Sequence, residues 1–176
     1  VGGVALAREI TARKRVEDEL RTVSESFESA FKSAPIGMAL VGLDGRAQRV
    51  TKALVDFLGY GAEELAELTV EEITHPDDIA EDRERADRLI DGQIESYELE
   101  KRYLRKSGES VWALLAVSLV RDEDGTPLYF ISQIKDITNR KQVEADLRRV
   151  AAEDSLTGVA NRRQFEADLA AQVSRC

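Results

Sequence analysis

Apolar residues recur at helical spacing near both ends of the chain. Residues 11–31 predict a helix, because their apolar positions step by four and three residues, as in the a/d seam of a coiled coil. This seam comprises Val16, Leu20, Val23, Phe27 and Ala30. The spacing returns near the C-terminus at Val143, Leu147 and Val150. The next seam position there is Asp154, so the apolar stripe ends and a different structure is expected to begin.

The two segments also repeat each other in sequence. Residues 10–21 return 127 residues later as residues 137–148, and eight of the twelve positions are identical. A repeat at domain length predicts that the unit between the copies is one module of an array, as in a signal relay. Two heptads are marginal as an isolated coiled coil, so we expect these helices to pair because the domains that they flank pair.

The pattern between the repeats first predicts two strands and three helices. They cover residues 36–41, 47–51, 52–58, 62–68 and 74–90. A hairpin turn at residues 43–46 joins the two strands. Gly61 is a permitted N-cap with Glu64 at N3, and Thr74 with Asp77 matches a capping box that opens the last helix.

Three further strands are expected at residues 97–106, 111–121 and 128–137, joined by turns that contain Gly108 and Gly125. Two strands, three helices and three strands in this order predict an α+β fold, with an antiparallel sheet and its helices grouped on one face. The strand at 111–121 is apolar on both faces. Alternation therefore does not tell which face of it points inward.

Composition limits the possible functions. The chain has 176 residues and a net charge of −9, and its Arg-rich stretches are interleaved with acids, so we expect no nucleic-acid binding. No apolar run approaches the roughly 18 residues of a membrane span, and we expect a cytoplasmic protein cut from a longer one. Cys176 is the only cysteine and His75 the only histidine, which excludes an intramolecular disulfide and a Cys/His zinc site.

Several short phrases between residues 24 and 138 resemble, in order, those of PAS domains. The phrases are Ser33-Ala34-Pro35-Ile36-Gly37-Met38, Leu58-Gly59-Tyr60, His75-Pro76-Asp77-Asp78, Arg105-Lys106-Ser107-Gly108-Glu109-Ser110-Val111-Trp112, Asp122-Glu123-Asp124-Gly125 and Asp136-Ile137-Thr138. The resemblance implies the PAS fold, a five-stranded antiparallel sheet with helices on one face, flanked by signalling helices. Glu9-Ile10-Thr11 matches the closing Asp-Ile-Thr of such domains, which implies a preceding PAS domain.

A second resemblance covers residues 154–169. The stretch from Asp154 to Phe165 is similar to the opening Asp-x-Leu-Thr-Gly-Leu-x-Asn-Arg-Arg of GGDEF domains, which are diguanylate cyclases, with Val159 where Leu is usual. The resemblance implies that the parent protein makes cyclic di-GMP, or carries a degenerate cyclase that feeds another output such as a phosphodiesterase. The chain ends at Cys176 before any cyclase signature, so we expect no enzyme activity of this fragment.

These resemblances give the expected domain organisation. The parts are the tail of a preceding PAS unit at 1–11, a signalling helix at 12–31, the PAS domain at 32–138, a second signalling helix at 139–153 and the truncated start of a GGDEF domain at 154–176.

PAS domains often enclose a small cavity, so the resemblance also implies a ligand site. The expected wall residues are Phe57, Tyr60, Ile73, Leu99, Tyr103, Trp112, Leu114, Ile131 and Gln133. An apolar cavity with few polar groups suits a small metabolite or a fatty acid. The alternative is an ordinary core around no ligand.

Cofactors of known PAS domains find little support in these residues. Light-sensing members use a cysteine that is missing here, and Ile134 stands where they place a flavin-bonding Gln. Covalent flavin is therefore excluded and non-covalent flavin is disfavoured. Haem needs an axial ligand, and the sole candidate His is His75, whose position favours first-turn packing and hydrogen bonding. Met38 is expected in the core. We predict no cofactor.

The expected function is a sensory and dimerisation module. The module would form a homodimer, sense a small molecule or the state of an upstream PAS domain, and move the C-terminal helix pair that leads into the cyclase. Asp136, Ile137 and Thr138 form the expected relay junction, where the Thr138 hydroxyl caps the helix. The alternatives are a ligand-free structural dimerisation spacer, and a haem or flavin sensor of redox state or gas.

Overall fold

The computed structural model describes residues 2–150 of the chain. These residues fall into an N-terminal unit that ends at Asp136 and a second unit that begins at Ile137. The first unit holds a long helix, α1 (Gly2–Ser33), and a sheet with further helices. The described part of the second unit is a helix over residues 138–150. Residues 154–169, which resemble the opening of a GGDEF domain, lie outside the described residues.

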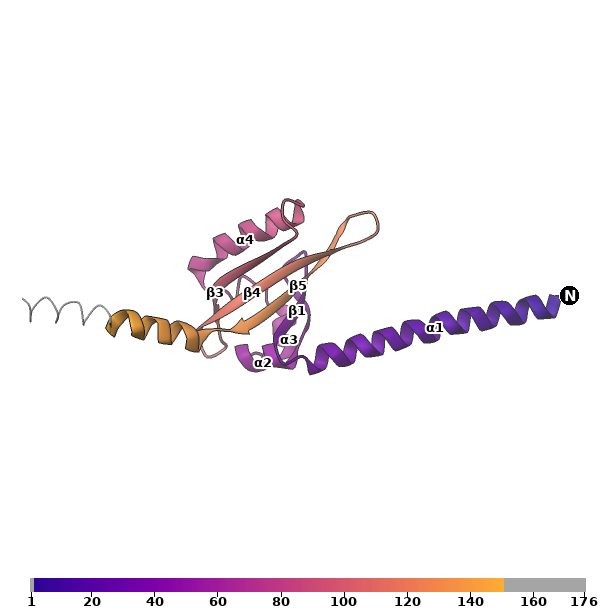
Figure 1. The fold of residues 1–176 in the computed structure, drawn as a ribbon, viewed down its shortest axis with the longest axis horizontal. Coiled ribbons are helices and arrows are strands. Elements are labelled where there is room, and N and C mark those ends of the chain that lie inside the picture. The colour runs from indigo at the N-terminus through magenta and orange to yellow at the C-terminus, as the bar shows by residue number, and fades with distance from the viewer. Residues whose placement is uncertain (1, 151–176) are drawn as a thin grey trace, which may run out of the picture. The chain divides into compact units, whose positions relative to one another are not determined.

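Five antiparallel strands form one sheet with the order β2-β1-β5-β4-β3 (Figure 1). The strands are β1 (Gly37–Gly42), β2 (Ala47–Val50), β3 (Ser96–Leu104), β4 (Ser110–Arg121) and β5 (Pro127–Asp136). The first and last strands, β1 and β5, pair directly in the middle of the sheet. The strands lie within two residues of the predicted ranges, and the α+β class with an antiparallel sheet is confirmed.

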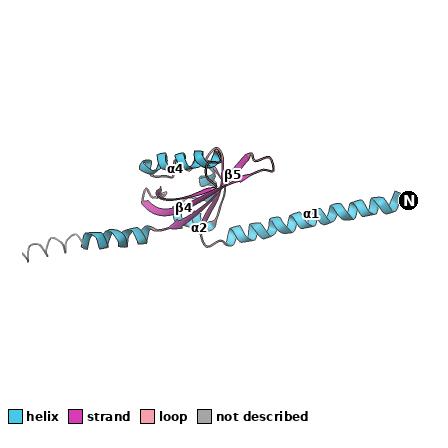
Figure 2. Ribbon diagram, turned by 45° about the horizontal axis from the view of Figure 1, so that its top comes forward, coloured by secondary structure: helices cyan, strands magenta, loops and turns pink. Residues whose placement is uncertain are grey.

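Three helices pack against one face of the sheet. They are α2 (Lys52–Leu58), α3 (Ala62–Glu67) and α4 (Pro76–Ile90). Figure 2 shows α4 running alongside the strands. In the chain, α2 contacts β1, α3 contacts β2, and α4 contacts β3 and β4. One cluster of buried side chains takes residues from all three helices and from the strands, so the helices share one core.

Local capping sets where these helices begin. The Thr51 hydroxyl accepts a hydrogen bond from the Leu54 N–H at the start of α2. The predicted Gly61 cap is confirmed, because the Glu64 carboxylate accepts the Gly61 N–H at 2.8 Å. The expected Thr74 cap is wrong by one residue. His75 is the N-cap of α4, and its side chain accepts from the Asp77 N–H, while Thr74 turns to the interior.

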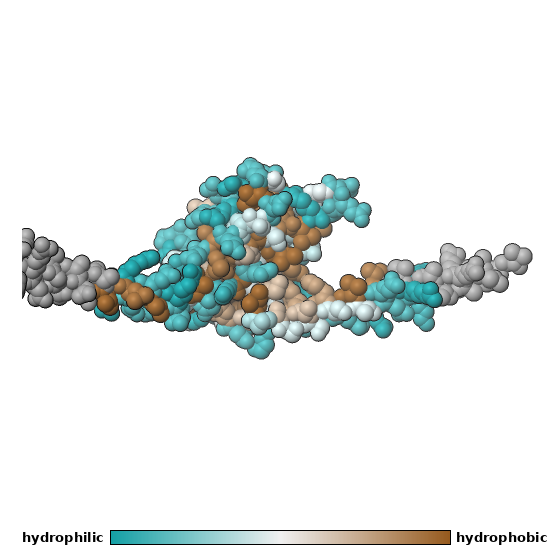
Figure 3. Space-filling view, in the orientation of Figure 1, coloured by the Kyte–Doolittle hydropathy of each residue, from teal (hydrophilic) through white to brown (hydrophobic). Residues whose placement is uncertain are grey.

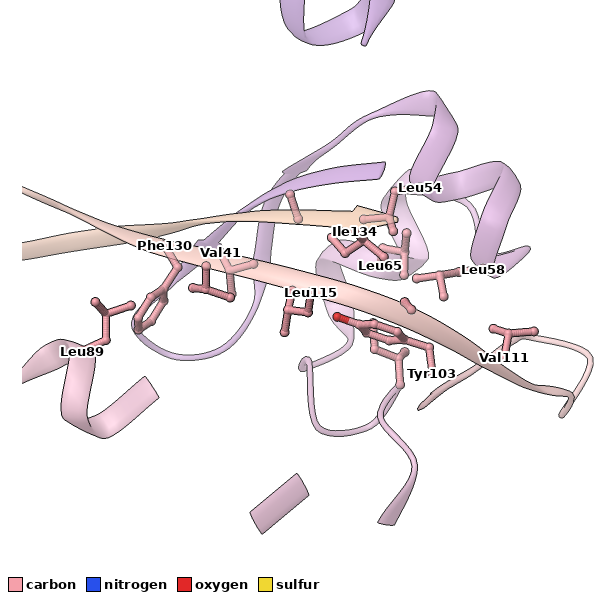
Figure 4. Close-up of a cluster of buried hydrophobic side chains, with 14 residues drawn as sticks. Val41, Leu54, Leu58, Leu65, Leu89, Tyr103, Val111, Leu115, Phe130 and Ile134 are labelled. Atoms are coloured by element: carbon pink, nitrogen blue, oxygen red, sulfur yellow. The ribbon is translucent and has the colours of Figure 1, made fainter. Parts of the chain in front are cut away.

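The sheet pairing resolves the face of β4 that alternation left open. Val111, Ala113, Leu115 and Val117 are buried and belong to the core under the helices, whereas the residues between them are half-buried on the other face. Figure 4 shows Leu115 and Val111 among side chains from the helices and from β1 and β5. The helices decide the inner face, because only one face of the strand meets them.

The flanking helices carry exposed apolar residues. α1 begins at Gly2, nine residues before the predicted start, so the segment expected to end a preceding domain is helical here. Leu20 and Val23 are 65% and 69% exposed, and Leu147 of the second helix is 65% exposed. Apolar side chains also reach the visible surface of both helices in Figure 3. A row of exposed apolar side chains is unusual on a surface that contacts no other protein.

The end of α1 is held against β2. The Arg49 guanidinium lies 5.3 Å and 5.0 Å from the ring centres of Phe27 and Phe31, and it pairs with the Glu28 carboxylate at 2.6 Å. Phe31 is buried, while Phe27 remains half exposed. These contacts fix the last turns of α1 to the sheet without using the rest of the seam.

The helix over residues 138–150 begins directly after β5. The Lys141 N–H donates to the Ile137 carbonyl, so Thr138 is the first helical residue and Ile137 precedes it. The predicted position of Thr138 before the helix is therefore shifted by one residue. The first residue of a helix is defined by its backbone hydrogen bonds. A sequence pattern predicts that residue only to within one or two positions.

We expect Leu58→Ala to lower the free energy of unfolding by about 2–5 kcal/mol, because Leu58 is fully buried among three helices and the sheet. Leu128→Ala removes the same atoms from a side chain that is 45% exposed, and should cost much less. Urea denaturation of both variants measures the difference. Equal costs would contradict the assigned core.

Candidate functional site

A cavity of about 390 Å³ lies between the sheet and its helices. Its walls are mostly apolar and come from all five strands and from α2, α3 and α4, with Val41, Leu115, Phe130 and Ile134 among them. This volume falls within the range of small-molecule sites, and an apolar wall with few polar groups is their usual design. Ala39 and Ala47 are small side chains that add little bulk to this space.

A buried ammonium group forms the polar part of the wall. Lys101 on β3 is 1% exposed, and its Nζ donates to the Thr74 hydroxyl at 2.9 Å and to the Asp82 carboxylate at 2.5 Å. The ammonium also lies 4.4 Å from the ring centre of Tyr103. Lysine is almost never fully buried unless it is paired, and here the partner comes from α4.

The electrostatics of this cluster follow from its burial. Burial lowers the pKa of the Lys101 ammonium, and the Asp82 carboxylate opposes that change. Burial, with a smaller effect of Asp82, raises the pKa of the Tyr97 hydroxyl, which donates to Asp82 at 2.9 Å. Burial also raises the pKa of Tyr103. Both phenols are therefore neutral hydrogen-bond donors across the physiological range.

The structure brings two of the nine predicted wall residues to the cavity, Ile73 and Tyr103. Leu99 is buried on the same face of β3 without lining the cavity, and Phe57 and Tyr60 pack against the edge of the core. The remaining residues lie on the opposite face of the sheet, namely Trp112, Leu114, Ile131 and Gln133.

This placement corrects the expectation for those four residues. Val117 pairs with Ser132 and Leu115 with Ile134, and these inward positions alternate with Leu114, Ile131 and Gln133. A strand that is apolar on both faces offers no sequence signal for its inner face. Whether any of the nine residues binds a ligand stays a prediction.

Sequence reasoning missed the polar wall residues Lys101, Asp82, Thr74 and Ser132. One signal was present for Lys101. It lies between Leu99 and Tyr103 at a spacing of two, so a strand that turns these inward turns the lysine inward as well. Asp82 gave no such signal, because it lies within a charged stretch of helix typical of a solvated face.

Of the three positions discussed for cofactors, His75 and Met38 lie away from the cavity and Ile134 lines it. His75 caps α4 and does not line the cavity, which agrees with its predicted first-turn role. The expectation that Met38 lies in the core is wrong, because it is half-buried on β1 outside the core cluster. Ile134 is a buried wall residue. Within residues 2–150, no three His, Cys, Asp or Glu side chains gather as a metal site. No described helix is long and apolar enough to span a membrane.

The first turn of α4 is fastened to β3 by a second ion pair. The Asp78 carboxylate accepts from the backbone and side chain of Arg102 at 2.7 to 2.9 Å. These hydrogen bonds, the guanidinium first, hold the pKa of Asp78 below its ordinary value of 3.8. The His75 N–H also donates to the Arg102 carbonyl. α4 is thus tied to β3 at its start by Asp78 and farther along by Asp82.

Known proteins resemble this arrangement. A family model described as "PAS fold" matches residues 49–134. The crystal structure of a PAS domain from Colwellia psychrerythraea superposes with a TM-score of 0.61 at 19% identity, over 66% of this chain and 98% of that one. The chain contains a PAS domain. The fold expected from the short phrases of the sequence is therefore confirmed.

Two curated relatives are similar to this chain in sequence. "Probable diguanylate cyclase DgcE" of Escherichia coli (strain K12) is 50% identical over 129 residues, which are 72% of this chain and 12% of that protein. "Sensor histidine kinase TmoS" of Ectopseudomonas mendocina is 28% identical over 83% of this chain and 15% of that protein. The chain thus spans a small part of each relative, and signalling proteins with different outputs share this kind of domain.

We expect Asp82→Ala to destabilise the PAS domain by about 3–5 kcal/mol, because it leaves the Lys101 ammonium buried without its carboxylate. Glu84→Ala removes an exposed carboxylate from the same helix, away from the cavity, and is the matched control. Urea denaturation at neutral pH compares the two. Similar losses of unfolding free energy in both variants would mean that the Lys101–Asp82 pair contributes no more than any other carboxylate on this helix.

The Asp78–Arg102 pair should also make stability depend on pH. Because the folded-state pKa of Asp78 is lowered, its stabilisation is present above 3.8 and is lost as the pH falls through the folded value. Asp78→Asn should therefore differ most from the unmodified chain near neutral pH and converge with it in acid. Urea denaturation between neutral and strongly acidic pH tests this, with Glu123→Gln in an exposed turn as control. A constant difference would contradict it.

Proposed function

We propose that this chain is a sensory and dimerisation module that controls a C-terminal diguanylate cyclase. Its PAS domain receives the signal, and the helix over residues 138–150 passes it on. The carrying observation is the exposed apolar seam next to the repeated junction. A relative of 50% identity that is named a probable diguanylate cyclase supports the output. The sequence similarity of residues 154–169 to the opening of a GGDEF domain supports it too.

The proposed dimer joins two copies of this chain through the seam. Its apolar positions are between 47% and 69% exposed, namely Leu20, Val23, Phe27, Val143, Leu147 and Val150. Val16 completes the predicted seam. Burying such residues against identical ones removes apolar surface from water, at about 25 cal/mol per Å². The seam is short, so the domains that it flanks must add to the pairing.

The proposed relay runs from the sheet into the helix. Asp136 ends the central strand β5, and the helix begins two residues later, after Ile137. The junction is short and contains no glycine or proline, so its backbone has little conformational freedom. A displacement of the strand is therefore passed on to the helix. A cyclase whose two active sites must face each other, as the GGDEF resemblance implies, responds to the resulting geometry of the helix pair.

The seam is tested in the parent protein by replacing Val143 and Leu147 together with Asp. We expect the variant to lose regulation of cyclic di-GMP synthesis, because two buried charges in each helix would separate the pair. Cyclic di-GMP formation is measured with the native input domains present. Sedimentation of the 176-residue chain should show a dimer that becomes a monomer in the variant.

Gln142→Asp with Ala145→Asp is the matched control, because it adds the same charge at exposed positions off the seam. This control should leave regulation and the dimer intact. Unchanged regulation in the Val143 and Leu147 variant would overturn the relay. A dimer that persists in that variant would show that the dimer interface lies outside the seam.

A further inference from the structure

Two hydroxyl groups line the cavity without a protein partner. Ser132 on β5 and Tyr103 on β3 are 8% and 5% exposed, and both belong to the cavity wall. Among the described residues, neither side-chain hydroxyl makes a hydrogen bond. No fully enclosed side-chain nitrogen or oxygen there lacks a partner, so both oxygens are open to the cavity. A partner for them has to enter from the cavity itself.

The positions of the two hydroxyls differ. Ser132 pairs across the sheet with Ala39 and Val117, in the middle of the apolar wall. Figure 4 shows the Tyr103 oxygen directed into the core toward Leu115. The Tyr103 ring also contacts the Lys101 ammonium. An apolar molecule in the cavity thus meets a hydroxyl in the middle of the sheet and another at the lysine end.

Buried polar groups in folded proteins nearly always have a hydrogen-bond partner, and an unsatisfied one is costly. Alanine at position 132 and phenylalanine at position 103 would fill the same space without this cost. Water in the cavity can supply such a partner, and so can an oxygen or nitrogen of a bound molecule. The two hydroxyls therefore offer a ligand two hydrogen-bonding positions in a mostly apolar wall.

The charges of the wall disfavour an anion most strongly, and the buried ammonium disfavours a cation at its end of the cavity. Four acids and two bases line the cavity, which are Asp44, Glu71, Asp82, Asp87, Arg83 and Lys101. Both bases are already paired, Lys101 with Asp82 and Arg83 with Glu71. An anion would meet a net negative wall, and a cation would lie beside the buried ammonium. Transfer of either ion into such a site also loses its hydration.

We propose that the cavity binds an uncharged, mainly apolar small molecule with a hydroxyl or carbonyl group, recognised by Ser132 and Tyr103. This inference rests on the sensory role proposed above and names the chemical class of its signal. Both hydroxyls donate or accept, so an alcohol, a phenol or a ketone satisfies them. The apolar wall provides affinity, and the hydroxyls provide selectivity between ligands.

Three probes of similar shape test the class on the purified 176-residue chain. 1-Naphthol is uncharged at neutral pH and carries one hydroxyl, naphthalene lacks the hydroxyl, and 1-naphthoate carries a charge. Binding is measured by ligand-observed NMR titration. We expect 1-naphthol to bind roughly three- to tenfold more tightly than naphthalene, the effect of one hydrogen bond, and more tightly than 1-naphthoate.

The variants Ser132→Ala and Tyr103→Phe test the residues. The double variant should lose the preference for 1-naphthol over naphthalene while binding naphthalene as before, and the single variants show which hydroxyl the probe uses. Gln133→Ala, on the opposite face of the sheet, should change nothing. Circular dichroism and thermal unfolding confirm that each variant is folded.

Three outcomes would overturn the proposal. They are saturable binding by none of the probes, tightest binding by 1-naphthoate, and a preference for 1-naphthol that survives in the double variant. The relay is judged separately, since binding is measured on this chain and regulation in the parent protein. If this chain binds 1-naphthol as expected but the seam variant of the parent protein keeps its regulation, the relay is overturned and the ligand class stands.

Discussion

The Lys101 ammonium connects three parts of the PAS domain from inside its core. It lies on β3, donates to Asp82 on α4, and donates to Thr74 in the segment before that helix. Desolvation of the ammonium is unfavourable, so the pair adds little net stability compared with an apolar core. It does demand one arrangement, because any other position of α4 leaves a buried charge without its carboxylate. The pair therefore acts with the Asp78–Arg102 pair and the apolar contacts of Leu89 to hold α4 over the sheet.

The same pair lies at one side of the cavity. Protein interiors are normally close-packed, and a wall of leucine and valine alone is free to collapse inward. Here the polar groups of Asp82, Tyr97 and Lys101 satisfy one another at one side of the space. α4 therefore rests on hydrogen-bonded groups as well as on apolar contacts. A molecule in the cavity, as proposed above, would lie next to the groups that position this helix.

The two ends of the domain are built differently. The last turns of α1 are held to β2 through Arg49 and the rings of Phe27 and Phe31. The C-terminal helix continues from the central strand β5, which pairs with both β1 and β4. A change in the curvature of the sheet reaches this strand from both sides.

The sequence by itself determined the order and limits of the strands, the starts of α2 and α3 and the PAS fold, because these depend on local spacing, turn chemistry and short phrases. The Gly61 cap and the turn glycines are examples, since hydrogen bonds and backbone angles within four residues settle them. Only the tertiary structure decided which face of β4 and β5 meets the helices. Trp112 and Gln133 suited a cavity wall by type and lie on the other face, while Lys101 and Asp82, polar by type, lie inside. The reason is that the surroundings of these side chains are formed by elements far away in the sequence. The order of polar and apolar residues along one strand does not indicate which elements pack against it.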